Sequence, residues 1–142
     1  MDSKDLFIFL RKHRLGVLAS VSPLGNPEAS LVGIAVTEKL EMIFDTIDAS
    51  RKCQNLRRCP KTAFVIGWEH EITLQLEGIA DEPAGEELAR LKKVYFEAFP
   101  DGPEREKWPG ITYFRVRPEW MRYSDYNDPV KIIEFSKEEL NR

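Results

Sequence analysis

Residues 44–56 read FDTIDASRKCQNL and decide the fold, because they join the end of a strand to the start of a helix. Apolar side chains recur at every second position of residues 40–46, which is the pattern of a half-buried strand. Ser50 is a suitable N-cap for a helix over residues 51–59, and Pro60 marks its end. The stretch therefore predicts a strand, a tight connection and a helix.

The N-terminus of this helix has the composition of an anion-binding site. Backbone N–H groups there lack intrahelical partners and carry the positive end of the helix dipole. Ser50, Arg51 and Lys52 add a hydroxyl group and two cations. Two adjacent cations in a first turn repel the dipole, which favours a bound anion such as phosphate. A solvated pair of surface charges is the alternative interpretation.

The remaining sequence reads mainly as strands joined by turns. A short helix capped by Ser3 comes first, and a longer amphipathic helix is expected over residues 83–99. Residues 100–110 are rich in Pro and Gly and form a loop that can act as a lid. A short capped helix or a frayed end is expected over residues 136–142. The expected strands cover residues 16–22, 28–36, 40–46, 62–68, 71–81, 111–117, 120–123 and 130–135, with a break at Pro118.

These strands predict the fold class. The first three form a meander, the next two form a hairpin, and no regular alternation of strand and helix is present. Connections of this kind are typical of antiparallel sheets that close or nearly close on themselves. We therefore expect a single domain over residues 1–142, mainly β, built as an antiparallel split barrel with inserted helices.

Composition excludes several classes of protein. The chain has 142 residues, 32% charged and 42% apolar, with a net charge of −3, so it gives no reason to expect nucleic acid or an anionic membrane as partner. No apolar run approaches the length of a membrane span. Residues 1–4 are polar and lack the features of a signal peptide, which makes the cytoplasm the expected location. Cys53 and Cys59 do not form a CxxC pair and are expected to be buried thiols.

Catalytic side chains are not apparent. His13 and His70 are the two histidines of the sequence, so no His-rich metal site is expected. The sequence also lacks the signatures of serine hydrolases, P-loop enzymes and dinucleotide-binding folds. An anion site without catalytic side chains suggests a cofactor that carries the chemistry itself. Alternate residues of 71–81 are polar, among them Thr73 and Gln75, and that face can either bind a heterocycle or be solvated.

Residues 15–82 resemble the FMN-binding split barrels related to pyridoxamine 5′-phosphate oxidase. The resemblance rests on a strand ending in FDT, the element SRKxxNLxxxP that follows it, and a later strand that closes with Leu76, Glu77 and Gly78. It implies the split-barrel fold, an FMN cofactor, and a homodimer with flavin bound between the subunits. It carries over to fold more strongly than to reaction.

The resemblance also implies particular site residues. The backbone of Ser30, Leu31, Val32 and Gly33 is expected to line the isoalloxazine ring. Asp45 and Thr46 match positions beside the flavin and its phosphate, while Arg51 and Lys52, next to Ser50, match the phosphate-binding pair. A glutamine that contacts the flavin in the oxidase aligns with Thr73, and Gln75 is the competing candidate on the same face.

The second half departs from the oxidase. Tyr95 occupies a plausible substrate-tyrosine position, but Phe99 and Pro103 stand where the oxidase has an arginine and a serine that hold the substrate phosphate. Apolar residues cannot replace those contacts, so oxidation of a vitamin B6 phosphate is not expected. Residues 119–126 instead resemble less characterised oxidase-like flavoproteins. Three aromatic residues either stack near the flavin, seal the dimer or belong to the core, namely Trp108, Trp120 and Tyr126.

The predicted function is hydride transfer by bound FMN between a small organic substrate and an acceptor such as oxygen or a nicotinamide. Two alternatives remain. A relative with this fold can use the deazaflavin F420, for which Arg57, Arg58 and Lys61 would supply extra cations. The protein can also be a non-enzymatic flavin or haem carrier.

Overall fold

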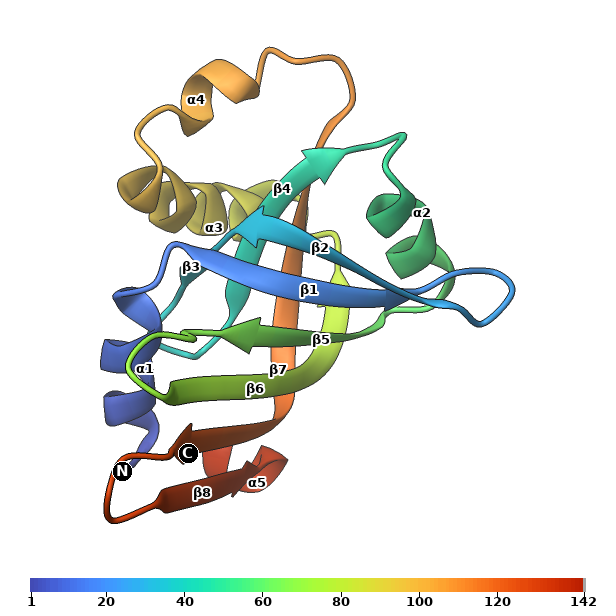
Figure 1. Ribbon diagram of the computed structural model, residues 1–142. Helices are drawn as coiled ribbons and strands as arrows, with labels where there is room; N and C mark the ends of the chain where they lie inside the picture. Colours follow the sequence, from blue (N-terminus) through green and yellow to red (C-terminus); the bar gives the residue numbers. More distant parts are fainter. Residues whose placement is uncertain (142) are drawn as a thin grey trace.

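A computed structural model of the protein describes residues 1–141, and within them eight strands form one antiparallel sheet with five helices around it (Figure 1). The strands are β1 Leu15–Val21, β2 Pro27–Gly33, β3 Ala35–Val36, β4 Met42–Ile47, β5 Lys61–Ile66, β6 Ile72–Asp81, β7 Ile111–Asp125 and β8 Lys131–Ser136. The helices are α1 Ser3–Arg11, α2 Arg51–Arg58, α3 Gly85–Ala98, α4 Gly102–Arg105 and α5 Lys137–Leu140.

The sheet curls until its two ends are joined by the chain itself. Its strand order is β2-β1-β5-β6-β7-β4-β3, and Ile34 alone separates β2 from β3. The first half of β7 pairs with β4 and its second half pairs with β8, while β6 pairs with the other side of residues 115–125. The predicted split barrel is therefore confirmed.

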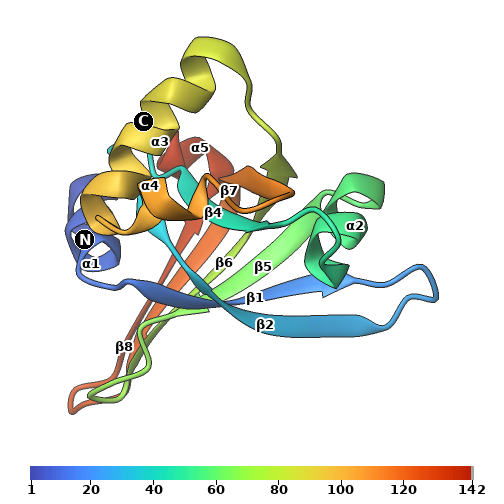
Figure 2. The same ribbon diagram turned by 90° about the horizontal axis from the view of Figure 1, so that it is seen from above.

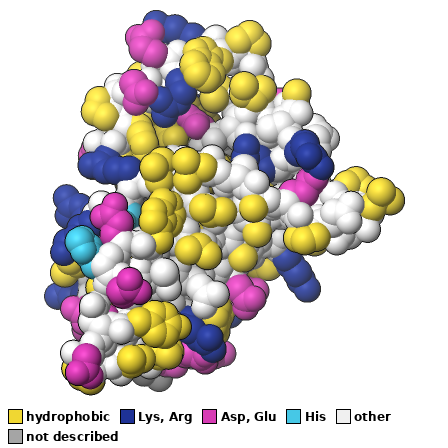
Figure 3. Space-filling view, viewed as in Figure 1, with side chains coloured by type: hydrophobic (Ala, Val, Ile, Leu, Met, Phe, Trp, Pro, Cys, Tyr) yellow, Lys and Arg dark blue, Asp and Glu magenta, His cyan; other side chains and the backbone are white. Residues whose placement is uncertain are grey.

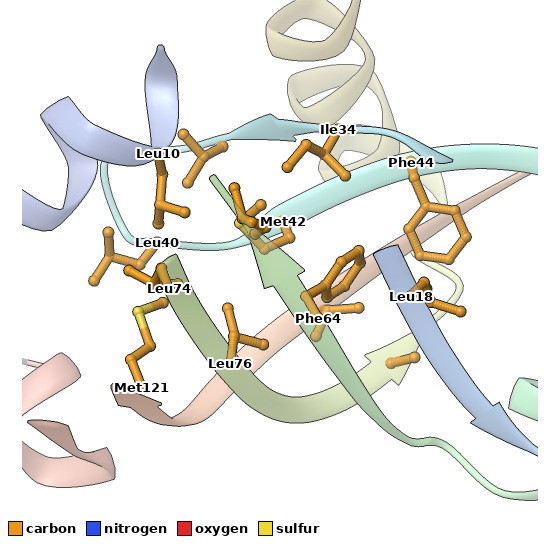
Figure 4. Packing of buried hydrophobic residues seen from close by; sticks show 14 of the residues in the cluster. Leu10, Leu18, Ile34, Leu40, Met42, Phe44, Phe64, Leu74, Leu76 and Met121 are labelled. Carbon is orange, nitrogen blue, oxygen red and sulfur yellow. The ribbon is translucent and has the colours of Figure 1, made fainter. Parts of the chain in front are cut away.

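The interior is filled by the alternate residues that the strand pattern predicted. Phe44 of β4 stacks on Phe114 of β7 with ring centroids 5.6 Å apart, and Phe64 of β5 meets Phe44 edge-on. Figure 4 shows Leu18, Phe64 and Ile34 converging in the same space. A second, smaller cluster lies between α3 and the strands β3, β4 and β7, and comprises Ala35, Ile43, Leu91, Tyr95 and Tyr113.

The helices occupy opposite ends of the barrel. Figures 1 and 2 both place α2 at one end of the β1–β2 hairpin, and α1 and α3 at the other. The strand β2 thus leads from the N-terminus of α2 toward the helices α1 and α3. None of the helices in the described part of the chain is both long and apolar enough to cross a bilayer.

Four local expectations need correction. Asp2, and not Ser3, caps α1. Its carboxylate accepts the backbone N–H of Asp5, and the carboxylate of Asp5 accepts the backbone N–H of Asp2. The expected strand over residues 28–36 bends at Ile34 and forms β2 and β3. The loop over residues 100–110 contains the short helix α4.

The fourth correction concerns Pro118, which was expected to break a strand. The strand β7 runs through it with a bulge at Glu119, since Trp120 lies opposite Glu77 of β6 and Pro118 lies opposite the next residue, Gly78. A bulge removes the ladder hydrogen bond that proline cannot donate. At the C-terminal end, Ser136 caps the helix α5, and the final residue of the expected tail lies outside the described residues.

Candidate functional site

The first turn of α2 has the predicted cap. Ser50 is extended, and its hydroxyl oxygen accepts the N–H of Cys53 at 3.2 Å. Thr46 Oγ1 lies 2.8 Å from Ser50 Oγ, so the end of β4 and the start of α2 share one hydrogen-bonded corner. The N–H groups of Arg51 and Lys52 remain without an intrahelical partner, as at every helix start.

A cavity of about 230 Å³ opens beside this turn, and we call it the anion cradle. Its lining comes from β1, β2 and α2 and consists of Ser20, Glu28, Ala29, Ser30, Arg51 and Lys52. The structure therefore brings Ser30 to Arg51 and Lys52, as predicted. The start of a helix, a hydroxyl group and two cations together are the donors that a phosphate or another small anion prefers.

A carboxylate also belongs to the cradle, and sequence reasoning missed it. The side chain of Glu28 is 16% exposed and forms an ion pair with Arg51. Its other oxygen accepts the Nδ2–H of Asn55 at 2.7 Å, and Asn55 also donates to Ser20 Oγ at 3.0 Å. The only signal in the sequence is Asn55 itself, a polar residue on the buried side of a short helix. Glu28 neutralises part of the positive charge that Arg51 brings.

The four candidate residues on β2 differ in their surroundings. Leu31 points outward and is 59% exposed, whereas Val32 is buried in the core. Gly33 faces the ring of Phe99, since a Cβ added at Gly33 would lie 2.9 Å from Phe99 Cζ. Together with Ser30 they form a short stretch of strand that begins at the anion cradle.

Asp45 forms an ion pair with a residue of α4. Its carboxylate accepts a hydrogen bond from Arg105 Nε at 3.0 Å, which ties α4 to β4. Arg105 also donates to the hydroxyl oxygen of Tyr95 at 3.4 Å and lies 5.9 Å from the centre of the Phe99 ring. Burial raises the pKa of Tyr95, and the nearby Asp45 acts in the same direction, so the hydroxyl stays protonated. Arg105 was not predicted, because its partners are 10 and 60 residues away.

Thr73 and Gln75 lie on the outer face of β6. Gln75 is opposite Val65 of β5, Val65 is opposite Val17 of β1, and Val17 is opposite Leu31 of β2. Both polar residues are thus three strands from β2. Within the described residues of one chain, they are not brought to the anion cradle.

The remaining candidates are spread over the molecule. Trp108 and Tyr126 are exposed, and Trp120 lies under the guanidinium group of Arg122 at 5.4 Å. Two of the three extra cations considered for a longer phosphate tail are engaged elsewhere: Arg57 pairs with Asp48 and Glu82, and Arg58 donates to the carbonyl oxygen of Val21. Cys53 and Cys59 are free thiols, the first buried and the second partly buried.

Comparison with known proteins gives the family. The sequence model of pyridoxamine 5′-phosphate oxidase matches residues 4–125. A search among curated protein sequences gives no match.

Solved structures with the same fold are numerous. A haem-binding protein from Mycobacterium smegmatis superposes with a TM-score of 0.85 at 18% identity, over 98% of this chain and 59% of that one. A Listeria innocua protein named for pyridoxamine 5′-phosphate oxidase has a TM-score of 0.72 at 21% identity, over 85% and 96% of the two chains. HutZ, the haem storage protein of Vibrio cholerae, has a TM-score of 0.71 at 18% identity, over 84% and 92%.

These identities show a shared fold, and the chain spans 59% of the length of the mycobacterial protein. The match to the oxidase model covers most of the chain, from the helix α1 to the end of β7. It includes the anion cradle, the strand β2 and the polar face of β6. The protein therefore belongs to the pyridoxamine 5′-phosphate oxidase family.

Proposed function

We propose that the protein binds FMN non-covalently and acts as an oxidoreductase on a small organic substrate. The observation that carries the proposal is the anion cradle, where the capped start of α2, Arg51 and Lys52 face Ser30 across a cavity of about 230 Å³. Membership of the family supports a flavin as the source of the anion.

The donors of the cradle fit a phosphate group. Two N–H groups of the first turn, the guanidinium of Arg51 and the ammonium of Lys52 can each donate a charge-assisted or dipole-assisted hydrogen bond. Glu28 opposes the phosphate, so Arg51 has to leave Glu28 before it binds the cofactor. The flavin ring would then extend along the backbone of β2 from Ser30 toward Gly33.

A second copy of the chain would complete this site. Leu15, Leu31 and Val65 are 45%, 59% and 37% exposed on the outer face of β1, β2 and β5. Figure 3 shows apolar side chains gathered over these strands. A homodimer that covers this face would bury the apolar side chains and bring Thr73 or Gln75 of one subunit toward the flavin of the other.

The chain's own residues would bind and orient the cofactor. Bound FMN supplies hydride transfer, and the protein supplies positioning and electrostatics. The backbone of β2 would hold one edge of the ring. Phe99 fills the space beside Gly33 where the oxidase grips a substrate phosphate, so the substrate is expected to differ from a vitamin B6 phosphate.

Titration with FMN tests the proposal. The wild-type protein should bind FMN, and an Arg51→Ala/Lys52→Ala double variant should bind it about a hundredfold more weakly, because two charge-assisted contacts are lost. The matched control is Arg57→Ala/Arg58→Ala, which removes two cations from the other end of α2 and should leave the affinity nearly unchanged. Absence of FMN binding by the wild type, or equal losses in the two variants, would contradict the proposal.

Haem binding is a second candidate function, because two of the similar structures are a haem-binding and a haem storage protein. The histidines of this chain are poorly placed as iron ligands. The His13 ring packs against Phe9 at a tilt, with centroids 4.7 Å apart, and its Nε2 would lie 3.0 Å from a Cβ added at Gly67. His70 is exposed in the turn before β6. FMN is therefore the better supported cofactor, and absorbance spectra after addition of hemin or FMN distinguish the two.

A further inference from the structure

A second cavity lies away from the anion cradle, between α1, β3 and α3, and has a volume of about 560 Å³. We call it the α1–α3 cavity. Its floor is apolar and is formed by Phe7, Leu10, Ile34, Val36, Val94 and Ala98. A volume of this size lies within the usual range of cavities that bind small organic molecules.

The rim of the α1–α3 cavity is positively charged. Its lining contains four side chains that are cationic at neutral pH and two carboxylates, namely Arg11, Arg14, Lys39 and Arg90 against Glu38 and Glu97. The whole chain, in contrast, has 21 cationic and 24 anionic side chains. Figure 3 shows Lys and Arg side chains along the edge of the molecule where α1 and α3 lie. Because Arg90 is paired with Glu41 and Glu87, the excess of positive charge that a ligand would meet comes from Arg11, Arg14 and Lys39 against Glu38 and Glu97.

The four cations are not equivalent. Arg90 is held by Glu41 and Glu87, and Arg14 donates to the carbonyl oxygen of Ala98 at the end of α3. These contacts tie α3 to the residues after α1 and to the residues before β4, which lie on the other sides of the cavity. Arg11 and Lys39 are exposed at the mouth, with the guanidinium of Arg11 5.9 Å from the centre of the Phe7 ring. Arg11 and Lys39 are thus the cations available to a ligand that enters the cavity.

The α1–α3 cavity is separate from the cradle, and the two share no lining residue. Ser30 lines the cradle and Ala35 lines the α1–α3 cavity. Ser30 belongs to β2 and Ala35 to β3, so the two residues are at most roughly 17 Å apart along the chain. A phosphate bound at α2 therefore leaves the α1–α3 cavity open to a different ligand.

We propose that the α1–α3 cavity binds an organic anion that has an apolar body. The body would lie on the floor between Leu10, Ile34 and Val94, and a carboxylate or sulfonate group would meet Arg11 and Lys39 at the mouth. An apolar floor selects against small inorganic anions, and the cationic mouth selects against neutral apolar molecules.

Fluorescence titration with 1-anilinonaphthalene-8-sulfonate tests the proposal on the full chain. The wild-type protein should bind the probe saturably, and decanoate should displace it while decanol should not. An Arg11→Glu/Lys39→Glu variant should bind the probe about tenfold or more weakly, because two attractions become repulsions. A second variant, Ala98→Trp, fills the cavity and should also abolish binding.

The control is Lys12→Glu/Lys93→Glu, which changes the net charge by the same amount on α1 and α3. Neither of these lysines lines the cavity, so this variant should keep the wild-type affinity within about twofold. Equal losses in the two charge variants, unchanged binding by the Arg11→Glu/Lys39→Glu variant, or displacement by decanol as effective as by decanoate would overturn the proposal. The charge variants alter exposed side chains, so they decide the result even if Ala98→Trp does not fold.

Discussion

Glu28 is the residue that most changes the chemistry of the anion cradle. It brings a negative charge into a site for which the sequence predicts only cations. Its carboxylate pairs with Arg51 and accepts a hydrogen bond from Asn55. A phosphate and this carboxylate compete for the same guanidinium group. The affinity of the cradle therefore depends on the difference between two interactions of Arg51.

Replacing Glu28 by Gln should strengthen FMN binding by about fivefold to tenfold, because the competing charge is removed while the hydrogen bond with Asn55 can persist. The measurement is a fluorescence titration of FMN at constant ionic strength. Riboflavin, which lacks the phosphate, serves as the control ligand and should bind equally well to both proteins. A weaker affinity of the variant for FMN would mean that Glu28 supports the site.

The cations of the cradle could be predicted and its carboxylate could not, for a physical reason. Ser50, Arg51 and Lys52 are adjacent in sequence, and a helix start gives their arrangement directly. Glu28 reaches them only because β2 pairs with β1 and places residue 28 opposite Ser20, beside α2. Contacts of this kind depend on strand register, which the hydrophobic pattern of one strand does not specify.

At the scale of elements, α3 is fastened to the barrel by a network of ion pairs. Arg115 of β7 is 6% exposed and contacts Asp81 of β6, Glu41 before β4 and Glu87 of α3. Arg90 of α3 contacts the same two glutamates. The two arginines thus join α3 to β7, to Asp81 at the end of β6 and to Glu41 before β4.

This network should make the stability of the protein depend on pH. Hydrogen bonds from Arg90 and Arg115 lower the pKa of Glu87 from 4.5 to about 2. Burial alone raises the pKa of Glu41, but hydrogen bonds from Arg90, Thr37 and Arg115 outweigh it, so this pKa is also below its usual value. Because the folded state favours the charged carboxylates, their contribution is complete above about pH 4.5 and is lost as the pH falls toward 2.

Thermal midpoints measured between pH 2.5 and 7 check this expectation. A Glu87→Gln variant should unfold at a lower temperature at pH 7 and should show a smaller decrease between pH 4.5 and 2.5 than the wild type. Glu86→Gln, an exposed neighbour on α3, is the matched control and should follow the wild-type curve. If Glu87→Gln and the wild type show the same pH dependence, Glu87 does not contribute to it.

Elements with a regular pattern were predictable, and those fixed by distant partners were not. The alternation in residues 71–81 predicts β6 correctly, with Leu74 and Leu76 buried. Pro118 was expected to break its strand, because proline removes a donor from the ladder. The strand continues because Pro118 lies at the bulge opposite Gly78, where the ladder is already interrupted. An added Cβ at Gly78 would lie 2.5 Å from the carbonyl oxygen of Arg117, so the glycine allows this close approach.

At the scale of the whole molecule, the proposed homodimer depends on the outer face of β1, β2 and β5. Leu31 of β2 lies on that face, opposite Val17 of β1, and is 59% exposed. A Leu31→Asp variant should be monomeric, because a charge in an apolar interface is costly to bury. Sedimentation velocity measures the change.

Leu24→Asp is the matched control, since Leu24 is 89% exposed in the turn between β1 and β2. It should leave the association state unchanged. If the dimer is required for the flavin site, Leu31→Asp should also weaken FMN binding while Leu24→Asp should not. A monomeric wild-type protein, or a dimeric Leu31→Asp variant, would contradict the proposed interface.

The late position of β7 in the chain has a kinetic consequence. The strand pairs with β4 through residues 111–116 and with β6 through residues 115–125. The strand β4 otherwise has only β3 beside it, and β6 only β5, so each lacks its second neighbour until residues 111–125 are present. Until the ribosome has released that segment, β4 and β6 are open strand edges, which are prone to pair with other chains. Folding is then limited by a pairing between distant segments, which is typically slow. The period of greatest aggregation risk during synthesis thus ends with the emergence of β7.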